Sequence, residues 1–415
     1  MSELQAPKGT FDVLPDKEAD YSEVEAVAAR VLGRAGYARI QTPIFESTEL
    51  FARGVGESTD IVAKEMYSFD DGGGRSVTLR PEGTAAICRS YIQNGMHKLP
   101  QPIRVWYSGP FFRHEAPQAG RFRQFHQIGA EALGSDRPEL DAEMVLLLAE
   151  VLEELSVGDL RLRLGSLGST ETRLTYRELL QAHLRANQDK LSEDVRSRID
   201  VNPLRAFDSA DPSTQEVMAT APLLLNSLDS VDAEHFQVVR ELLDAAGVAY
   251  EVDPRLVRGL DYYGRTVFEF TSDRLGAQSG VGGGGRYDGL MELLGGPATP
   301  GIGWAAGVER ILLARDQRDA PEPSCDLLVV ALEADRLNDA FVLANLARSQ
   351  GIEARLEVTG RSVKASLKHA NKIGARGVAL LDSSGDQLKN MDTGEQIAAE
   401  SVATLLDALR GMMVQ

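Results

Sequence analysis

The chain has few of the residues that form covalent cross-links and metal sites. Its 415 residues include two cysteines and six histidines. Cys88 and Cys325 lie far apart, and neither has a CxxC or CxxH neighbour, which argues against a disulfide framework and against a zinc site. Each cysteine is most simply a small buried hydrophobic residue. We therefore expect a protein of the reducing cytoplasm that has no structural metal ion.

Long hydrophobic runs and an excess of positive charge are also missing. No stretch approaches the roughly 18 apolar residues of a membrane span, and the first residues lack the basic and then apolar order of a secretory signal. The formal net charge is −18, from 44 basic and 62 acidic residues. Such a charge argues against indiscriminate binding to nucleic acid or to anionic membranes, although a local basic patch could still hold a specific nucleic acid. The length predicts two or three domains.

Arginine is concentrated in one segment. Residues 113–131 (RHEAPQAGRFRQFHQIGAE) contain three arginines and no lysine, between a β-prone run at 103–112 and an alternating run from Phe125. This pattern predicts two antiparallel strands joined by a polar loop. Arginine suits planar, bidentate contacts to phosphate, so the segment indicates a site for a phosphorylated ligand. The alternative is a solvated sheet edge that carries charge for solubility.

The second of these strands has one distinctive face. Because side chains alternate along a strand, Gln127, Gly129 and Glu131 lie on the same side. An amide and a carboxylate then flank a position that has no side chain. We expect this gap to leave room for a small polar ligand beside the phosphate.

A second unusual cluster follows much later in the chain. Residues 256–270 (LVRGLDYYGRTVFEF) crowd Arg258, Asp261 and two tyrosines into a turn before a strand. Residues 279–290 (SGVGGGGRYDGL) then bring four consecutive glycines. Glycine loses much backbone entropy on folding, so a run of four glycines needs a reason. Close approach of the main chain to a ligand or to another strand would provide one. A floppy loop is the alternative.

The segment 301–314 (GIGWAAGVERILLA) predicts a strand, a turn at Gly307 and a helix. Arg310 falls in the first turns of that helix, near an N-terminus suited to anions. The sequence has no GxxxxGK[ST] motif, and neither of its GxGxx[GA] matches, at 280–285 and 301–306, opens a helix inside a βαβ unit. Any nucleotide is therefore expected to be held by arginines and strands.

Hydrophobic periodicity divides the chain into parts. Asp16 would cap a first helix, Pro43 confines a strand to an edge or an interface, and 319–324 (DAPEPS) has the composition of a linker. Predicted helices of the first part are 17–35, 81–93 and 137–155, and predicted strands are 38–46 and 76–79. Residues 170–246 are mostly helical in period. After the linker, a strand from 325 is followed by helices and strands at about 334–350, 353–358, 361–374, 376–381 and 398–412, which indicates a compact α/β domain.

Four motifs, in this order, resemble the histidyl-tRNA synthetases, a family of class II aminoacyl-tRNA synthetases. They are LRPEGT (79–84), RFRQFHQ (121–127), RGLDYY (258–263) and GGGGRYDGL (282–290). The resemblance implies an α+β catalytic core, with an antiparallel sheet of six or seven strands flanked by helices, in a homodimer. The implied domains are a core at 1–169 and 250–320, a helical insertion at 170–249 and an anticodon-binding α/β domain at 325–415.

The resemblance also implies an activity. The carboxylate of L-histidine attacks the α-phosphorus of ATP, which gives histidyl-adenylate and pyrophosphate, and histidine is then transferred to the 3′ end of tRNA(His). The implied partners are L-histidine, ATP with Mg²⁺, tRNA(His) and a second copy of the chain, and no membrane. Both reacting groups of the first step are anionic, so the enzyme must mainly position them and neutralise charge.

The matching positions receive roles by resemblance. Arg113 would contact the α-phosphate, and Arg310 the β- and γ-phosphates and the adenine. Arg258 would bridge the histidine carboxylate and the α-phosphate, which makes Arg258 and Arg113 the expected catalytic residues. Glu115 would bind the adenine amino group and Phe125 would stack on the ring.

The implied histidine pocket contains Arg258, Glu82, Thr84, Gln127, Glu131, Tyr262 and Tyr263. Glu131 and Tyr263 would meet the two imidazole nitrogens, and Glu82, Thr84 and Gln127 the α-amino group. Three alternatives stay open: Glu82 as a first-turn acid of a helix, Tyr262 as a core residue, which we favour, and Glu131 as an exposed strand carboxylate. His114 and His126 are expected to be structural, because adenylation needs no side-chain proton transfer.

Binding of tRNA is expected at two places. In the hairpin loop the expected contact residues are Gln118, Arg121 and Arg123. Ala116 and Ala119 stand where the family commonly has basic residues, so contact with phosphate there is weaker or comes from Arg121 and Arg123. In the last domain, residues 355–376 hold six basic residues against one acid. Arg361, Lys364, Lys368 and Lys372 have helical spacing on one face, which suits tRNA phosphates or a merely solvated surface.

Three other functions are alternatives. A plain acidic α/β binding module leaves the clustered arginines and glycines unexplained. The regulatory subunit of ATP phosphoribosyltransferase resembles these synthetases but usually lacks an intact RGLDYY block and the terminal domain, and both are present here. A synthetase for another amino acid is disfavoured by the RGLDYY block together with the glycine run.

Overall fold

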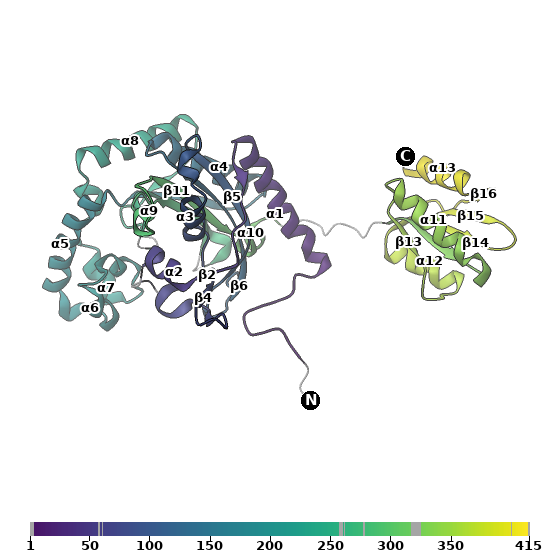
Figure 1. The fold of residues 1–415 in the computed structure, drawn as a ribbon, viewed down its shortest axis with the longest axis horizontal. Coiled ribbons are helices and arrows are strands. Elements are labelled where there is room, and N and C mark those ends of the chain that lie inside the picture. The colour runs from purple at the N-terminus through teal and green to yellow at the C-terminus, as the bar shows by residue number, and fades with distance from the viewer. Residues whose placement is uncertain are drawn as a thin grey trace. The chain divides into compact units, whose positions relative to one another are not determined.

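The computed structural model describes residues 4–56, 59, 61–256, 260, 262–276, 279–316, 325–399 and 401–413. The chain divides into two compact units, Met1–Gln317 and Arg318–Gln415 (Figure 1). None of the helices in the described part of the chain has the length and the apolar composition that a membrane span requires.

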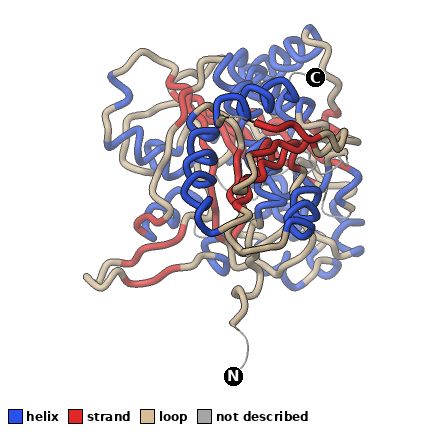
Figure 2. Tube along the Cα trace, turned by 90° about the vertical axis from the view of Figure 1, so that its right-hand side faces the viewer, coloured by secondary structure: helices blue, strands red, loops and turns tan. Residues whose placement is uncertain are grey.

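An eight-stranded sheet forms the centre of the first unit, and its strands are drawn in red in Figure 2. In spatial order the strands are β1 (Ala38–Arg39), β5 (Ile103–Phe112), β6 (Gln124–Leu133), β11 (Gly301–Gly307), β10 (Gly280–Arg286), β9 (Gly264–Ser272), β7 (Leu160–Ser166) and β8 (Glu251–Val252). The pairs from β5 to β7 are antiparallel, and the outermost pairs, β1 with β5 and β7 with β8, are parallel. This confirms the predicted antiparallel core.

The two faces of the sheet differ because side chains alternate along each strand. On β11, Trp304 and Ala306 belong to a core beneath α1 (Pro15–Arg34), α4 (Pro138–Glu154) and α8 (Ser230–Ala245). The residues between them and beside them, Gly303, Ala305 and Gly307, are small. The opposite face of the sheet is therefore open at its middle.

The glycine run is a strand in the middle of the sheet, which excludes the floppy loop. In β10, a side chain at Gly284 would begin 1.9 Å from the carbonyl oxygen of Gly303 on the neighbouring strand. Only glycine fits where two backbones approach so closely. The expectation that main chain lies against another strand is confirmed.

Two predictions near the N-terminus were wrong in part. The segment 38–46, which Pro43 was expected to interrupt, is indeed divided there into β1 and β2 (Phe45–Ser47), because proline lacks the N–H that a ladder needs, but the two pieces do not share one sheet. β2 instead joins a three-stranded sheet with β4 (Ser76–Leu79) and β3 (Ser68–Asp70). Asp16 does not cap α1 either, since the helix begins at Pro15 and Asp16 lies in its first turn.

The helix predicted from Pro81 begins three residues later, as α3 (Thr84–Gln93). The carboxylate of Glu82 accepts hydrogen bonds from the backbone N–H groups of Thr84 and Ala85, at 2.7 and 3.0 Å. These are orphan donors at a helix start. Glu82 thus satisfies the helix end from outside it.

Residues 170–246 are helical, as predicted. The helices are α5 (Thr170–Ala186), α6 (Glu193–Arg198), α7 (Pro212–Met218) and α8. The first three gather at one side of the first unit (Figure 1) around a separate cluster of buried residues that includes Tyr176, Leu180 and Val217. The remaining α-helices described in this unit are short: α2 (Thr48–Val55), α9 (Leu290–Leu293) and α10 (Val308–Ala314).

The second unit is an α/β domain, as predicted. Its five-stranded sheet has the order β13 (Ala354–Leu356), β12 (Cys325–Ala331), β14 (Ala375–Leu381), β15 (Asp386–Asn390) and β16 (Gln396–Ala399). Its helices are α11 (Leu337–Ser349), α12 (Val363–Lys372) and α13 (Val402–Met413). The antiparallel pair β15 and β16 was not predicted, because its short, polar strands lack a clear apolar alternation.

Candidate functional site

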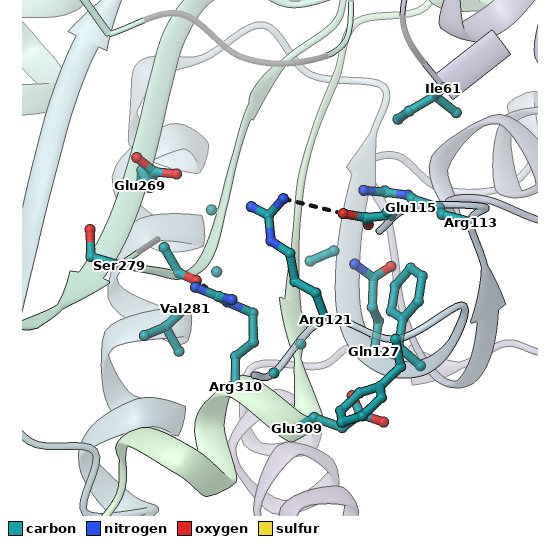
Figure 3. Close-up of a pocket in the computed structure, with 18 of the residues that line it drawn as sticks. Ile61, Arg113, Glu115, Arg121, Gln127, Glu269, Ser279, Val281, Glu309 and Arg310 are labelled. Atoms are coloured by element: carbon teal, nitrogen blue, oxygen red, sulfur yellow. Dashed lines mark hydrogen bonds and ion pairs between the residues drawn. The ribbon is translucent and has the colours of Figure 1, made fainter. Parts of the chain in front are cut away.

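A cavity of about 590 Å³ opens on the side of the sheet where β11 carries small residues. Side chains from the hairpin loop, from β6 and from α10 point into it (Figure 3). Its lining includes Arg113, Glu115, Arg121, Phe125, Gln127 and Arg310. The structure thus brings together six of the predicted site residues from segments almost 200 positions apart.

Four arginines and four glutamates line the cavity, and three of the arginines, Arg113, Arg121 and Arg310, come from the hairpin loop and α10. The Arg113 guanidinium donates to the carbonyl of Pro81 at 2.9 Å and lies 5.4 Å from the Phe125 ring centroid. Arg310 donates to the carbonyl of Gly280. Burial lowers the pKa of Arg310, and the positive charge of Arg121 lowers it further. Cations held together in this way favour an anionic ligand, and Phe125 offers a flat apolar surface next to it.

The three residues of the hairpin loop that are predicted to contact tRNA lie in different surroundings. Arg121 points into the cavity and pairs with Glu115 at 3.2 Å (Figure 3). Arg123 is not among the lining residues, and its side chain donates to the carbonyl of Glu115 at 3.3 Å. Gln118 is exposed at the tip of the loop, where its backbone pairs with that of Arg121. Arg121 is therefore placed to act on the ligand of the cavity as well as at the loop.

Gln127 and Glu131 share a face of β6, as the alternation predicted. Gln127 lies opposite Gly109 on β5 and Gly307 on β11, so small neighbours flank it on both sides. Its side-chain oxygen is buried and has no hydrogen-bond partner among the described residues. Such an atom is costly unless a ligand pairs with it. The geometry suits a bound ammonium group.

Glu131 is fully buried, so it is not an exposed strand carboxylate. Its two oxygens accept hydrogen bonds from the Thr84 hydroxyl at 2.8 Å and from the Tyr287 hydroxyl at 2.5 Å. Burial raises the pKa of Glu131 to about 8 against the lowering effect of these two donors. The role of Tyr287 was missed, although the motif around it was recognised. Tyr287 directly follows β10 and Glu131 lies on β6, so their contact cannot be inferred without the strand order.

The gap at Gly129 was interpreted wrongly. Tyr107 lies directly opposite Gly129 on β5, and a side chain at Gly129 would begin 2.3 Å from its ring carbon Cζ and 2.4 Å from its hydroxyl. The missing side chain therefore makes room for Tyr107 and not for a ligand. A side chain at Gly83 would begin 2.5 Å from the Cζ of the same ring.

The remaining residues of the predicted histidine pocket fall into three groups. Glu82 is buried and engaged by the start of α3, and burial raises its pKa. Tyr262 and Tyr263 are both buried, with ring centroids 4.7 Å apart, and Tyr262 also lies 5.7 Å from the Tyr287 ring. Arg258 lies outside the described residues. In the described ranges, no three His, Cys, Asp or Glu side chains form a group that could hold a metal ion.

Glu309 was also missed. It is buried, directly precedes Arg310, and accepts hydrogen bonds from the backbone N–H of His126 at 2.9 and 3.1 Å. The His126 ring nitrogen Nδ1 lies 3.1 Å from it, and the Tyr21 hydroxyl donates to it at 3.4 Å. Glu309 therefore ties α10 to β6 and to α1. His126 has the structural position that was expected.

In the second unit, the predicted basic face is shorter than expected. Arg361 lies before α12, which begins at Val363 with Ser362 as its N-cap, and it pairs with Glu357 at 2.6 Å. Lys364, Lys368 and Lys372 are exposed on the helix itself. Three lysines at intervals of four residues remain as the basic stripe.

The family of the chain is shown by comparison with known proteins. The family model for histidyl-tRNA synthetase matches residues 9–311. A histidine–tRNA ligase of Halorhodospira halophila is 48% identical and aligns over 98% of this chain and 99% of its own length. The apo structure of Staphylococcus aureus histidyl-tRNA synthetase has a TM-score of 0.82 at 34% identity, with coverage of 98% and 100%.

The similarity to a second solved structure shows a common fold and nothing more. It is described as an ATP phosphoribosyltransferase regulatory subunit/histidyl-tRNA synthetase from Bacillus halodurans, with a TM-score of 0.67 at 20% identity and coverage of 92% and 100%. The full-length relative and the family model go further than this. With its arginine-lined cavity and a buried carboxylate on the same sheet face, the chain belongs to the histidyl-tRNA synthetase family.

Proposed function

We propose that this protein is a histidine–tRNA ligase that activates L-histidine with ATP and transfers it to the 3′ end of tRNA(His). One observation carries the proposal. Strand β6 presents Phe125 and Gln127 to an arginine-lined cavity and, further along the same strand, the buried carboxylate of Glu131. This arrangement supports the proposal of a phosphate site next to a selective polar pocket.

In the first step, a carboxylate oxygen of histidine forms a bond to the α-phosphorus of ATP, and the bond to pyrophosphate breaks. Negative charge accumulates on the oxygens around the α-phosphorus and on the leaving pyrophosphate. Arg113 and Arg310 are placed to offset it, and Arg258, by resemblance, would bridge the two substrates. Fixed cations in a partly buried cavity need no reorganisation when the charge develops. ATP would enter with Mg²⁺, Phe125 would stack on the adenine, and Glu115 would accept from its amino group.

Histidine is selected by partners for both ring nitrogens. Glu131 would accept from one imidazole N–H, while Tyr263 would meet the other nitrogen. Gln127, with its unpaired oxygen, and Thr84 would meet the α-ammonium group, together with Glu82. A site whose buried polar groups need a partner rejects substrates that lack one, because those groups would be left unsatisfied. Tyr262 completes the wall of the pocket as a core residue.

In the second step, a ribose hydroxyl at the end of tRNA(His) attacks the acyl carbon of the adenylate, the bond from that carbon to the phosphate oxygen breaks, and AMP leaves. Gln118, Arg121 and Arg123 of the hairpin loop are the proposed contacts to the acceptor end, and the helical insertion would clamp the acceptor arm. Arg361, Lys364 and Lys368 are the proposed contacts of the anticodon-binding domain, residues 325–415. The protein would act as a cytoplasmic homodimer.

The proposal is tested by ATP–pyrophosphate exchange with each amino acid in turn, in the absence of tRNA. We expect exchange with histidine alone. Exchange with another amino acid would assign a different synthetase. A folded protein without any exchange would instead favour the non-catalytic regulatory subunit.

The variant Arg258→Ala tests the proposed bridge. We expect loss of histidine-dependent exchange by a factor of about 10² or more, because a preorganised charge at the reacting phosphate is removed. Arg255→Ala is the matched control, since Arg255 is exposed three positions earlier and its side chain contacts only a carbonyl, that of Ala219, among the described residues. A wild-type rate for Arg258→Ala would rule out the bridging role.

A further inference from the structure

Next to the histidine pocket, the structure buries a second charged group that the proposed chemistry does not use. Arg286, at the end of β10, has no exposed surface. Its guanidinium contacts the carboxylate of Asp141 through Nε, at 3.0 and 3.2 Å, and through Nη2. Nη1 donates to the carbonyl of Ser135 and to Asp288, both at 3.0 Å. Asp141 lies on α4 and is also fully buried.

The group extends into the helical insertion. His235, on α8, places its ring nitrogen Nε2 2.8 Å from the second oxygen of Asp141. Burial alone would raise the pKa of Asp141, but the adjacent charge of Arg286 and the contact with His235 lower it overall. The carboxylate is therefore ionised and is held from two sides. A core strand, a core helix and an insertion helix meet at this one side chain.

Stability alone does not account for such a group. Removing an arginine and a carboxylate from water costs more than their attraction returns unless the geometry is excellent, and apolar residues of similar volume are often as stable. A buried ion pair does, however, define one position for the backbone that carries it. The question is what this position serves.

The residue that follows Arg286 is Tyr287, whose hydroxyl donates to Glu131 at 2.5 Å. Adjacent side chains of a strand point to opposite sides, so Arg286 anchors the chain on one side while Tyr287 reaches the pocket on the other. Two hydrogen bonds to the backbone of Gly301 hold the chain at this point. The Tyr287 N–H donates to the Gly301 carbonyl at 2.8 Å, and the Asp288 carboxylate accepts from the Gly301 N–H at 3.2 Å.

The contact of Tyr287 decides how Glu131 is oriented. One oxygen of Glu131 is held by Thr84 and the other by Tyr287. Without Tyr287, the second oxygen would be left buried and unsatisfied, and the carboxylate could rotate away from the imidazole. The adenine and phosphate contacts, in contrast, involve other side chains, none of which touches Arg286 in the described structure.

We propose that Arg286, clamped by Asp141 and His235, is a positioning residue that holds the Tyr287 hydroxyl against Glu131 and so orients the carboxylate for the histidine imidazole. The inference rests on the proposed function and assigns to an insertion helix a part in the amino-acid pocket. Loss of the clamp should weaken histidine binding selectively and leave ATP binding as it is.

The test is histidine-dependent pyrophosphate exchange by the full chain, with KM measured separately for histidine and for ATP. For Arg286→Met and for Tyr287→Phe we expect the KM for histidine to rise about tenfold, the effect of one lost buried hydrogen bond to a charged group, with the KM for ATP within a factor of about two. The double variant should be no worse than the poorer single variant, since both remove the same contact. Arg286→Lys should recover part of the loss.

Arg315→Met is the matched control. Arg315 resembles Arg286 in being nearly buried and in pairing with two carboxylates. These carboxylates, Asp20 and Glu23, belong to α1, away from β10. It should leave both KM values unchanged. If Arg286→Met does not fold, Tyr287→Phe and the milder His235→Ala carry the test, and both should raise the KM for histidine.

The outcomes are distinct. Absence of exchange in the wild-type protein would remove the proposed function itself. Wild-type exchange together with an unchanged KM for histidine in Tyr287→Phe and His235→Ala, additive effects in the double variant, or an equal rise for histidine and ATP would each overturn the positioning role alone.

Discussion

Glu131 combines complete burial with a polar setting. Thr84 and Tyr287 donate to it, yet burial raises its pKa to about 8. At neutral pH the carboxyl group of Glu131 is therefore mostly in its neutral form. A ligand that donates a hydrogen bond to the carboxylate would favour its ionised form. Occupation of the pocket by imidazole should thus be accompanied by loss of the proton from Glu131.

The raised pKa has a consequence for stability. Between the ordinary value of 4.5 and about 8, the folded protein keeps a proton on Glu131 that the unfolded chain releases. The contribution of this group to the free energy of unfolding is therefore full below about 4.5, is lost as pH rises through about 8, and is constant above that. One pKa unit corresponds to about 1.4 kcal/mol, so the total loss is on the order of a few kcal/mol.

We expect Glu131→Gln to remove this slope. Thermal melting of wild type and variant between pH 5 and about 8.5 should show the wild type losing stability relative to the variant as pH rises. Glu153→Gln, at an exposed position of α4, should run parallel to the wild type. A constant difference between wild type and Glu131→Gln over the whole range would contradict the raised pKa.

At the level of the elements, close packing of β10, β11 and β6 forms the floor of the site. Gly284 admits the backbone of β11, and Gly303 of β11 admits the carboxylate of Glu131. A side chain at Gly303 would begin 1.6 Å from the Glu131 oxygen Oε2. The small residues of β11 are thus required by the strands beside them as much as by a ligand.

Gly303→Ala should therefore displace Glu131 and abolish histidine-dependent exchange, with a loss of about 1–3 kcal/mol in the free energy of unfolding from overpacking. Gly33→Ala is the control, because we expect it to raise the free energy of unfolding where Gly303→Ala lowers it. Gly33 lies in α1 with nothing within 4 Å of an added side chain, so alanine there should stabilise the helix by about 1 kcal/mol. Melting curves and exchange rates of the two variants decide the matter, and full activity of Gly303→Ala would contradict the described packing.

At the level of the whole molecule, the two compact units have separate cores. All residues of the candidate cavity belong to the first unit, and buried residues such as Leu327, Val329 and Leu343 form a core within the second. The exposed lysines of α12 give the second unit a basic stripe in a chain whose net charge is −18. The division suggests that adenylation and tRNA binding can be separated.

A fragment of residues 1–317 is expected to fold and to keep histidine-dependent exchange, because it contains the whole cavity. Its charging of tRNA(His) should fall steeply, since the proposed phosphate contacts of Lys364 and Lys368 are lost. Exchange and aminoacylation measured on the same preparation distinguish the two steps. A folded fragment that is inactive in exchange would show that the second unit contributes to the site.

The sequence by itself determined the elements and the chemical types at the site. Alternation placed Gln127 and Glu131 on one face, the arginine-rich hairpin was located with its loop, and the order of four motifs indicated the family. These features depend on neighbours in the chain, whose spacing sets which side chains share a face. Residues 170–246 are mostly helical and the terminal domain alternates helices and strands up to β14 for the same reason, whereas β15 and β16 lack the apolar alternation that would have predicted them.

Only the tertiary structure decided which distant residues meet. Tyr107 fills the gap at Gly129 because of the register of β5 against β6, and Tyr287 reaches Glu131 because β11 alone separates β10 from β6. Arg286 finds Asp141, at a separation of 145 residues, through the packing of α4 on the sheet. Strand order and helix packing follow from burial summed over the whole chain, which no local pattern contains.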